Sequence, residues 1–159
     1  MFHQIGIREA SPDDIPGISR LISDLATRYI AHEFTVEGAL RLLSAMNEDA
    51  IMGYFQRGYR YHVAEADDTL AGVAATRDNR HLYHLFVADE YQGHGLATQL
   101  WRIARDACLA AHDTHEFTVN SSRFAVGFYE KLGFVRQAEF QEHDGVISIP
   151  MKLIAKTAD

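Results

Sequence analysis

Hydrophobic residues near the start of the chain follow first a strand pattern and then a helical pattern. Ile5 and Ile7 alternate with polar residues, which is typical of a short strand. Ser11 and Pro12 then indicate a helix start, because Ser favours the N-cap and Pro the first helical position. The apolar residues that follow are spaced three or four apart and predict an amphipathic helix: Ile15, Ile18, Ile22, Leu25 and Tyr29.

The middle of the chain predicts helices followed by strands. A second helical pattern covers roughly residues 35–55, and Asn47 favours a break into two short helices. Three strand-like runs follow, over residues 59–66, 69–76 and 81–87, separated by short polar turns. Turns this short predict antiparallel neighbours.

The last part of the chain alternates helix and strand. After a turn that contains glycine, a long helix places Leu96, Leu100, Ile103 and Ala107 on one face. We then expect a strand over 116–119, a helix over about 122–132, a strand from Phe134 and a last strand over 146–154. With no linker, repeat or low-complexity tract, the pattern predicts one α/β domain over residues 1–159.

Composition and charge narrow the classes of function. The 159 residues carry 22 acidic and 15 basic side chains, a net charge of -7, which argues against a nucleic-acid partner. Such acidity is compatible with a cationic substrate, although it also serves solubility alone. The single cysteine, Cys108, excludes an internal disulfide and fits a reducing compartment. The start of the chain shows no basic region followed by an apolar run, and no apolar stretch is long enough to cross a membrane. We therefore expect a cytoplasmic protein without a secretory signal or membrane partner.

The glycine turn before the long helix is the most informative segment. It reads Gln92-Gly93-His94-Gly95-Leu96-Ala97-Thr98. Backbone N–H groups at a helix N-terminus lack intrahelical partners and attract anions, and glycine lets a phosphate approach the backbone. The two glycines alone are equally consistent with a simple tight turn. A Walker A loop is excluded because no Gly-Lys-Ser/Thr follows, and a dinucleotide fold requires a third glycine in a parallel βαβ unit.

The same segment resembles a signature of the GNAT superfamily of N-acetyltransferases, Gln/Arg-x-x-Gly-x-Gly/Ala, with Gln92, Gly95 and Ala97 at its defined positions. A second signature matches downstream at residues 118–122 and 128–134. The resemblance extends from the first strand to residues 150–153. It implies an α/β fold with a mixed, mostly antiparallel GNAT-like sheet that is splayed near its middle and flanked by helices. It also implies acetyl-CoA as the acyl donor and an amine as the acceptor.

The resemblance further implies which residues bind acetyl-CoA. Backbone groups freed by the splay pair with the pantetheine arm, the N–H of Val87 serves as oxyanion donor, and the glycine turn holds the pyrophosphate. The implied residues are Phe86, Val87, Gln92, Gly93, His94, Gly95, Leu96, Ala97, Thr98, Asn120 and Ser122. Asn120 and Ser122 are equally suited to capping the next helix. His94 departs from the family, which often has Lys or Arg there, so backbone donors must carry more of the phosphate binding.

Tyr129 is the candidate general acid. A phenol with a pKa of about 10 stays protonated at neutral pH and can protonate a thiolate whose pKa is about 8.5. Core packing is the alternative, since Ala125, Phe128, Tyr129 and Leu132 lie at helical spacing. The match to the second signature favours the acid.

His84 is the first candidate for the general base that a protonated amine requires, since it shares a strand face with Phe86. Glu142 and Asp144 are the others, and His84 is also consistent with a hydrogen-bonded strand residue. We expect no metal: alternation places His81 and His84 on opposite faces, and His112 and His115 lack a known ligand pattern.

The resemblance to the GNAT superfamily also implies an acceptor pocket between the first two helices and the last hairpin. Its residues mix aromatic and acidic types, which suits a cationic amine on a small molecule or peptide. They are Tyr29, His32, Glu33, Phe34, Phe55 and the 141–146 turn, with Phe34 and Glu142 as the substrate-binding candidates. Two other functions stay open: a non-catalytic acyl-CoA sensor, and an acyltransferase for a longer acyl-CoA. Assembly as a homodimer also stays open.

Overall fold

The computed structural model describes residues 4–154 and contains the helices and strands in the predicted order. In chain order the elements are β1 (Ile5–Glu9), η1 (Pro12–Asp14), α1 (Ile15–Tyr29), η2 (Ala31–Glu33), α2 (Val36–Ser44), α3 (Glu48–Gln56), β2 (Arg60–Ala66), β3 (Thr69–Arg77), β4 (His81–Val87), η3 (Asp89–Tyr91), α4 (Leu96–Ala111), β5 (Glu116–Ser121), α5 (Val126–Leu132), β6 (Val135–Arg136), β7 (Gln141–His143) and β8 (Val146–Ile154).

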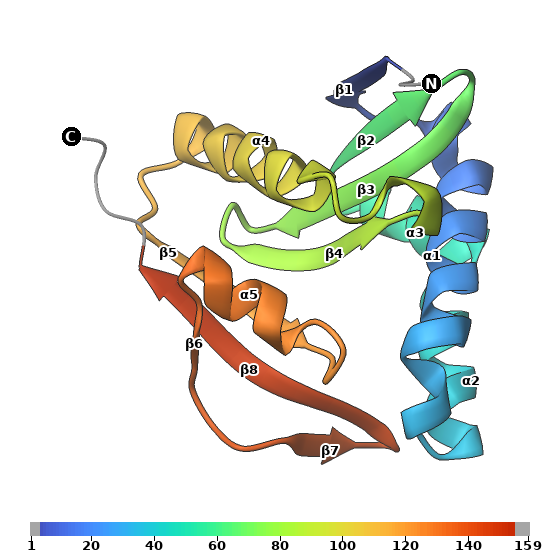
Figure 1. Ribbon diagram of the computed structural model, residues 1–159, viewed down its shortest axis with the longest axis vertical. Coiled ribbons are helices and arrows are strands. Elements are labelled where there is room, and N and C mark those ends of the chain that lie inside the picture. The colour runs from blue at the N-terminus through green and yellow to red at the C-terminus, as the bar shows by residue number, and fades with distance from the viewer. Residues whose placement is uncertain (1–3, 155–159) are drawn as a thin grey trace.

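The strands form one sheet in the order β1-β2-β3-β4-β5-β8-β6, with β7 paired to β8 (Figure 1). All neighbours are antiparallel except β4 and β5, which run parallel. These two strands pair only at His81–Thr118 and Leu82–Val119, and then separate. The predicted mixed, mostly antiparallel sheet with a splay near its middle is therefore confirmed.

An irregularity in β4 lies where the two strands separate. The register of β4 on β3 runs from Leu82–Thr76 directly to His84–Ala75, so Tyr83 is an extra residue. Such a bulge bends its strand and increases the local twist, which turns β4 away from β5. The simple alternation that set His81 and His84 on opposite faces therefore does not hold across Tyr83.

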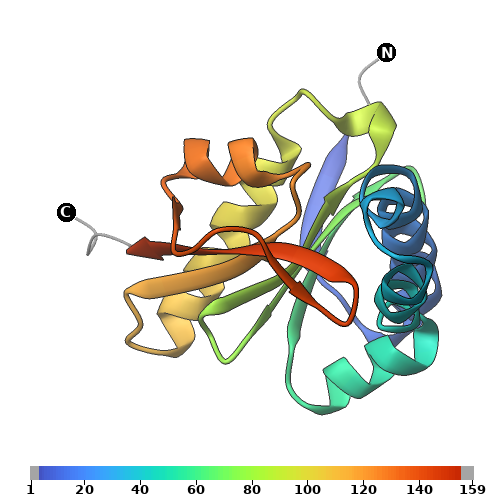
Figure 2. The same ribbon diagram turned by 90° about the horizontal axis from the view of Figure 1, so that it is seen from below.

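Helices cover both faces of the sheet (Figure 2). On β2, Val63 packs with α1 and α3, while the next residue, Ala64, packs with α4. Val73 and Ala74 divide in the same way on β3. Because successive strand residues point to opposite faces, one apolar run supplies both layers of the core.

The N-terminal helices follow the sequence pattern. The apolar stripe of α1 is buried, and Tyr29 at its end is half-buried. The side chain of Asn47 accepts a hydrogen bond from the N–H of Ala50 at 2.8 Å and caps α3, so the predicted break is confirmed.

Helix α4 buries only part of the expected face. Leu96, Leu100, Ala104 and Cys108 are buried together with Trp101, whereas Ile103 is 38% exposed. Of the predicted apolar face, Leu96 and Leu100 are therefore buried, whereas Ile103 lies at its exposed edge. The indole of Trp101 packs edge-on against Phe117 of β5, with 5.2 Å between ring centres.

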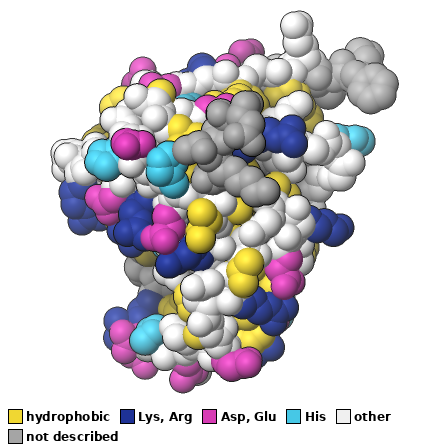
Figure 3. All heavy atoms as spheres, turned by 90° about the vertical axis from the view of Figure 1, so that its left-hand side faces the viewer, with side chains coloured by type: hydrophobic (Ala, Val, Ile, Leu, Met, Phe, Trp, Pro, Cys, Tyr) yellow, Lys and Arg dark blue, Asp and Glu magenta, His cyan; other side chains and the backbone are white. Residues whose placement is uncertain are grey.

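The surface mixes charges of both signs. On the face shown in Figure 3, basic and acidic side chains lie interspersed. Glu116, for example, pairs with Arg80 at 2.8 Å and with Lys152 at 3.1 Å. Within residues 4–154, no helix is long and apolar enough to cross a membrane. The same residues contain no group of three or more His, Cys, Asp or Glu side chains that could hold a metal ion.

The hairpin of β7 and β8 reaches back to α2 at the lower end of the molecule (Figure 1). Its turn residues, Asp144 and Gly145, both have positive φ, at 53° and 84°, as a tight two-residue hairpin turn requires. Gly38 of α2 lies against this turn, and a Cβ on Gly38 would come within 2.8 Å of the Gly145 Cα. Since real Cβ atoms do not approach backbone so closely, glycine at position 38 permits the contact.

We expect Gly38→Ala to lower the free energy of unfolding by about 1–3 kcal/mol, because the added methyl forces the hairpin away from α2. Gly53→Ala is the matched control: Gly53 also lies within a helix, but an added Cβ there meets nothing within 4 Å. That variant should gain about 0.5–1 kcal/mol from helix propensity. Urea unfolding of both variants measures the difference. Equal stabilisation by the two substitutions would show that α2 and the hairpin are not in tight contact.

Candidate active site

The splay leaves one edge of β4 without a strand partner. The N–H of Ala88 donates to the carbonyl of Ala71 at 2.8 Å, so Ala88 bonds to β3. Backbone groups alternate in direction along an antiparallel strand, and Phe86 and His84 therefore also bond to β3. The backbone groups of Leu85 and Val87 point the other way, into the space where β5 has turned aside.

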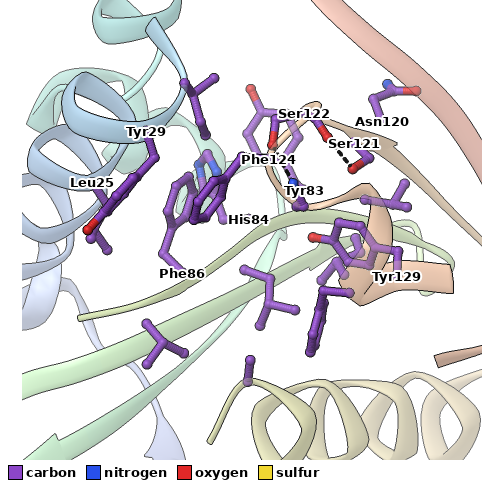
Figure 4. A pocket seen from close by; sticks show the side chains of 18 of the residues that line it. Leu25, Tyr29, Tyr83, His84, Phe86, Asn120, Ser121, Ser122, Phe124 and Tyr129 are labelled. Carbon is purple, nitrogen blue, oxygen red and sulfur yellow. Dashed lines mark hydrogen bonds between the residues drawn. The ribbon is translucent and has the colours of Figure 1, made fainter. Parts of the chain in front are cut away.

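A cavity of about 690 Å³ occupies this space. Its walls come from α1, α2, β4, the start of α4, the end of β5, α5 and β8. Figure 4 shows its central part, with the rings of Tyr29, Phe124, His84 and Phe86 on one side and Tyr129 on the other. The splay, the glycine turn and α5 therefore open into a common space.

The glycine turn follows the end of β4 and begins α4. Gly93 and Gly95 have φ values of 81° and 78°, which side chains with a Cβ rarely adopt. A Cβ at either position would meet nothing within 4 Å, so the space in front of the turn is open. Gly95 is the N-cap of α4 and no side chain caps this helix. The first-turn N–H groups therefore face the open space, as an anion site requires.

Side chains hold the glycine turn against β4 and α1. The amide of Gln92 donates to the carbonyl of Val87 at 2.9 Å. The hydroxyl of Tyr29 donates to Asp89 at 2.6 Å, and Arg28 forms an ion pair with the same carboxylate. These contacts fix the position of the helix N-terminus relative to the free edge of β4. His94 is exposed and does not line the cavity, whereas Leu96, Ala97 and Thr98 do.

Tyr129 lies on α5 with its ring in the core and its hydroxyl directed into the cavity (Figure 4). The side chain is only 6% exposed, and its ring packs edge-on against Phe128 and Phe134 with centres 5.5 Å apart. Burial raises the pKa of the Tyr129 phenol above its ordinary value. The hydroxyl is therefore protonated throughout the physiological range.

His84 lines the cavity and is surrounded by aromatic rings. Its ring centre lies 4.5 Å from that of Tyr83 and 5.9 Å from that of Phe86. Among the described residues its Nε2 has no hydrogen-bond partner. Burial lowers the pKa of His84 to about 3, because the charged form would lose its hydration. At neutral pH the imidazole is neutral and a weak base.

Asn120 and Ser122 line the cavity at the end of β5. The hydroxyl of Ser122 also accepts a hydrogen bond from the N–H of Ala125 at 3.2 Å, but Ala125 is the N-cap of α5 and no side chain caps this helix. Helix α5 begins only at Val126, so the expected helix start at residue 122 is wrong and residues 123–125 form a turn. Asn120 is exposed opposite Pro150 of β8.

The acceptor end of the cavity differs from its expected composition. Phe34 lines it, but Glu142 is exposed on β7 and does not, and His32, Glu33 and Asp144 also lie outside. Phe55 instead stacks on Tyr61 in the core, with ring centres 4.9 Å apart. Among residues 4–154, no Asp, Glu, Lys or Arg lines the cavity.

Sequence reasoning missed Phe124, which stacks on Tyr29 with ring centres 4.8 Å apart. Phe124 is 59% exposed and bridges the turn after β5 to α1. The sequence contains a signal for this residue: Phe124 is aromatic but does not belong to the apolar stripe of Ala125, Phe128 and Leu132. Leu42 and Met46 were missed for a different reason: they read as ordinary core positions of a helical segment.

Comparison with known proteins agrees with this geometry. A sequence model of the acetyltransferase (GNAT) domain matches residues 30–155. No curated protein matches the chain in sequence. Among solved structures, a GCN5-related N-acetyltransferase from Rhodopseudomonas palustris superposes with a TM-score of 0.80 at 19% identity, covering 97% of this chain and 98% of that chain.

Two further structures share the fold. The PaiA N-acetyltransferase of Thermoplasma acidophilum, solved in complex with coenzyme A, has a TM-score of 0.78 at 20% identity, with 95% of this chain and 99% of that chain covered. The spermidine/spermine N-acetyltransferase SpeG of Vibrio cholerae has a TM-score of 0.60 at 20% identity, with 95% and 94% covered. The family match covers most of the sequence, and the chain therefore belongs to the GNAT family of acetyl-CoA-dependent N-acetyltransferases.

Proposed function

We propose that this chain transfers the acetyl group of acetyl-CoA to a primary amine of a small molecule or peptide by direct attack. The observation that carries the proposal is the common opening of three features into one cavity: the free edge of β4, the N-terminus of α4 and the hydroxyl of Tyr129. When bound, acetyl-CoA supplies a thioester whose carbonyl carbon accepts the amine nitrogen and whose sulfur departs.

The chain's residues fit such a donor. The outward-facing backbone of Leu85 can pair with an amide-bearing arm as a further strand would, while the carbonyl of Val87 is bonded to Gln92. The open space before Gly93 and Gly95, together with the uncapped start of α4, suits a pyrophosphate. His94 is exposed beside this turn, where its ring can add a hydrogen bond to phosphate. We assign Asn120 and Ser122 to the opposite wall, beside the arm.

The N–H of Val87 is our proposed oxyanion donor. It belongs to the free edge of β4, and the carbonyl of the same residue is held by Gln92 at 2.9 Å. That hydrogen bond restricts the rotation of the peptide units around Val87. A donor that is already oriented needs no reorganisation when negative charge develops on the thioester oxygen, which is the main source of electrostatic stabilisation in acyl transfer.

We assign Tyr129 as the general acid that protonates the departing thiolate. Its hydroxyl points into the cavity and remains protonated because burial raises its pKa. The same dry surroundings also raise the pKa of the thiol that departs beside it. Because the pKa values of the phenol and the thiol rise together, proton transfer from Tyr129 to the thiolate stays feasible. The low pKa of His84 makes it a poor general base. We propose instead that its neutral ring accepts a hydrogen bond from the amine and orients it.

We expect CoA to raise the melting temperature of the protein at about 1 mM, by mass action, whereas NAD and ATP do not. Gly95→Glu should remove the increase, because it places a side chain and a negative charge in front of the helix N-terminus. Gly58→Glu is the matched control, since Gly58 is also exposed with positive φ and open space but lies outside the cavity. Thermal denaturation with each ligand is the measurement. Loss of the CoA effect in both variants would point to backbone strain instead of a phosphate site.

Tyr129→Phe should lower turnover by roughly 10²–10⁴-fold, the usual contribution of a positioned proton donor, while the ring keeps its packing. Tyr61→Phe is the control, because Tyr61 is a buried core tyrosine whose hydroxyl has no partner in the described residues and does not line the cavity. Its turnover should equal that of the wild type. Release of CoA thiol under saturating acetyl-CoA measures both. Wild-type turnover in a folded Tyr129→Phe protein would show that Tyr129 is not the general acid. If the wild-type protein binds CoA but shows no turnover, an acyl-CoA sensor is favoured instead.

A further inference from the structure

The part of the cavity away from the glycine turn has walls without charge. We call this part the distal half of the cavity, and define it by Ile30, Phe34, Leu42, Met46, Val146 and Ile147. All six side chains are apolar. Its walls come from the residues flanking η2, from α2 and the turn after it, and from β8, and α2 contacts the hairpin of β7 and β8.

Charged side chains on the helices beside the cavity form ion pairs outside it. Asp89 is held by Arg28 and by the hydroxyl of Tyr29. Arg41 faces both Glu37 and Asp144 on the outer side of α2. An ammonium ion that entered the distal half would lose its hydration without gaining a carboxylate, which is costly.

The cavity also lacks a group that can remove the proton of an ammonium ion. Of its two histidines, His81 hydrogen-bonds Thr118 at 2.7 Å and burial lowers its pKa to about 4, while the pKa of His84 is about 3. Burial raises the pKa values of the phenols of Tyr83 and Tyr129, which stay protonated. Aromatic faces attract cations, but they leave the proton on nitrogen. Only an unprotonated amine is a nucleophile.

We propose that the acceptor is an amine that is uncharged at neutral pH and attached to an apolar, aromatic frame, of the arylamine class, with its ring in the distal half of the cavity. This inference rests on the proposed acetyltransferase function and narrows its substrate. An arylamine nitrogen shares its lone pair with the ring, so its conjugate acid is a far stronger acid than an alkylammonium ion and has already lost its proton at neutral pH. Such a substrate arrives in the nucleophilic form and needs no base from the protein. Polyamines are excluded by the same argument.

The test compares two isomeric amines, 4-methylaniline and benzylamine, with spermidine as a third substrate. We expect kcat/KM for 4-methylaniline at pH 7 to exceed that for benzylamine by about tenfold or more, and to stay level between about pH 6 and 9. For benzylamine, kcat/KM should rise with pH as its neutral form accumulates, and spermidine should not be acetylated. Thiol release with acetyl-CoA measures all three.

A pair of variants tests whether the distal half of the cavity determines the preference for an arylamine over an alkylamine. Leu42→Glu adds a carboxylate to it and should lower kcat/KM for 4-methylaniline while improving that for benzylamine. Leu40→Glu adds the same charge to the exposed side of the same helix, where Leu40 is 62% exposed, and should leave both values unchanged. If Leu42→Glu does not fold, Phe34→Glu serves the same purpose.

Equal or higher kcat/KM for spermidine or benzylamine at pH 7 would overturn the arylamine assignment while leaving the acetyltransferase intact. Turnover of none of the three amines by a protein that CoA stabilises would also overturn it. Failure of the broader proposed function has a different signature, since CoA would then not raise the melting temperature at all.

Discussion

The separation of β4 from β5 is the constraint on which the rest of the site depends. A strand edge inside a protein leaves N–H and C=O groups without partners, and each unpaired group costs about 1–3 kcal/mol when it is buried. Here the two strands share only two residue pairs before the extra residue Tyr83 turns β4 away. The unpaired edge is therefore available to a ligand that carries its own amide groups.

The surrounding elements keep this edge open and positioned. Helix α5 forms one wall of the cavity, with Tyr129 packed against Phe128 and Phe134. On the other side, Asp89 and Gln92 connect the glycine turn to α1 and to the end of β4. The proposed acid, oxyanion donor and phosphate site are thus carried by different elements whose relative positions are held by packing and hydrogen bonds. Preorganisation of this kind is what catalysis of acyl transfer requires.

Much of this arrangement could be predicted from the sequence, because the patterns involved are local. The stripe of α1, the cap at Asn47 and the glycine turn each depend on residues close together in the chain. The bulge at Tyr83 could not be predicted, since it exists only in the pairing of two strands. The position of Glu142 could not be predicted for a similar reason. The acids of the last hairpin were expected at the acceptor pocket, but Glu142 lies outside it. Which face of a three-residue strand points inward is decided by tertiary contacts.

The central claim is that the free edge of β4 binds the acyl donor through its backbone. Amide hydrogen exchange of β4, followed by NMR with and without CoA, tests this claim most directly. The amides of His84 and Phe86 bond to β3 and should exchange slowly in both states. That of Leu85 faces the splay and should become protected only when CoA is added. Unchanged exchange at Leu85 under saturating CoA, with protection elsewhere in the molecule, would contradict the account.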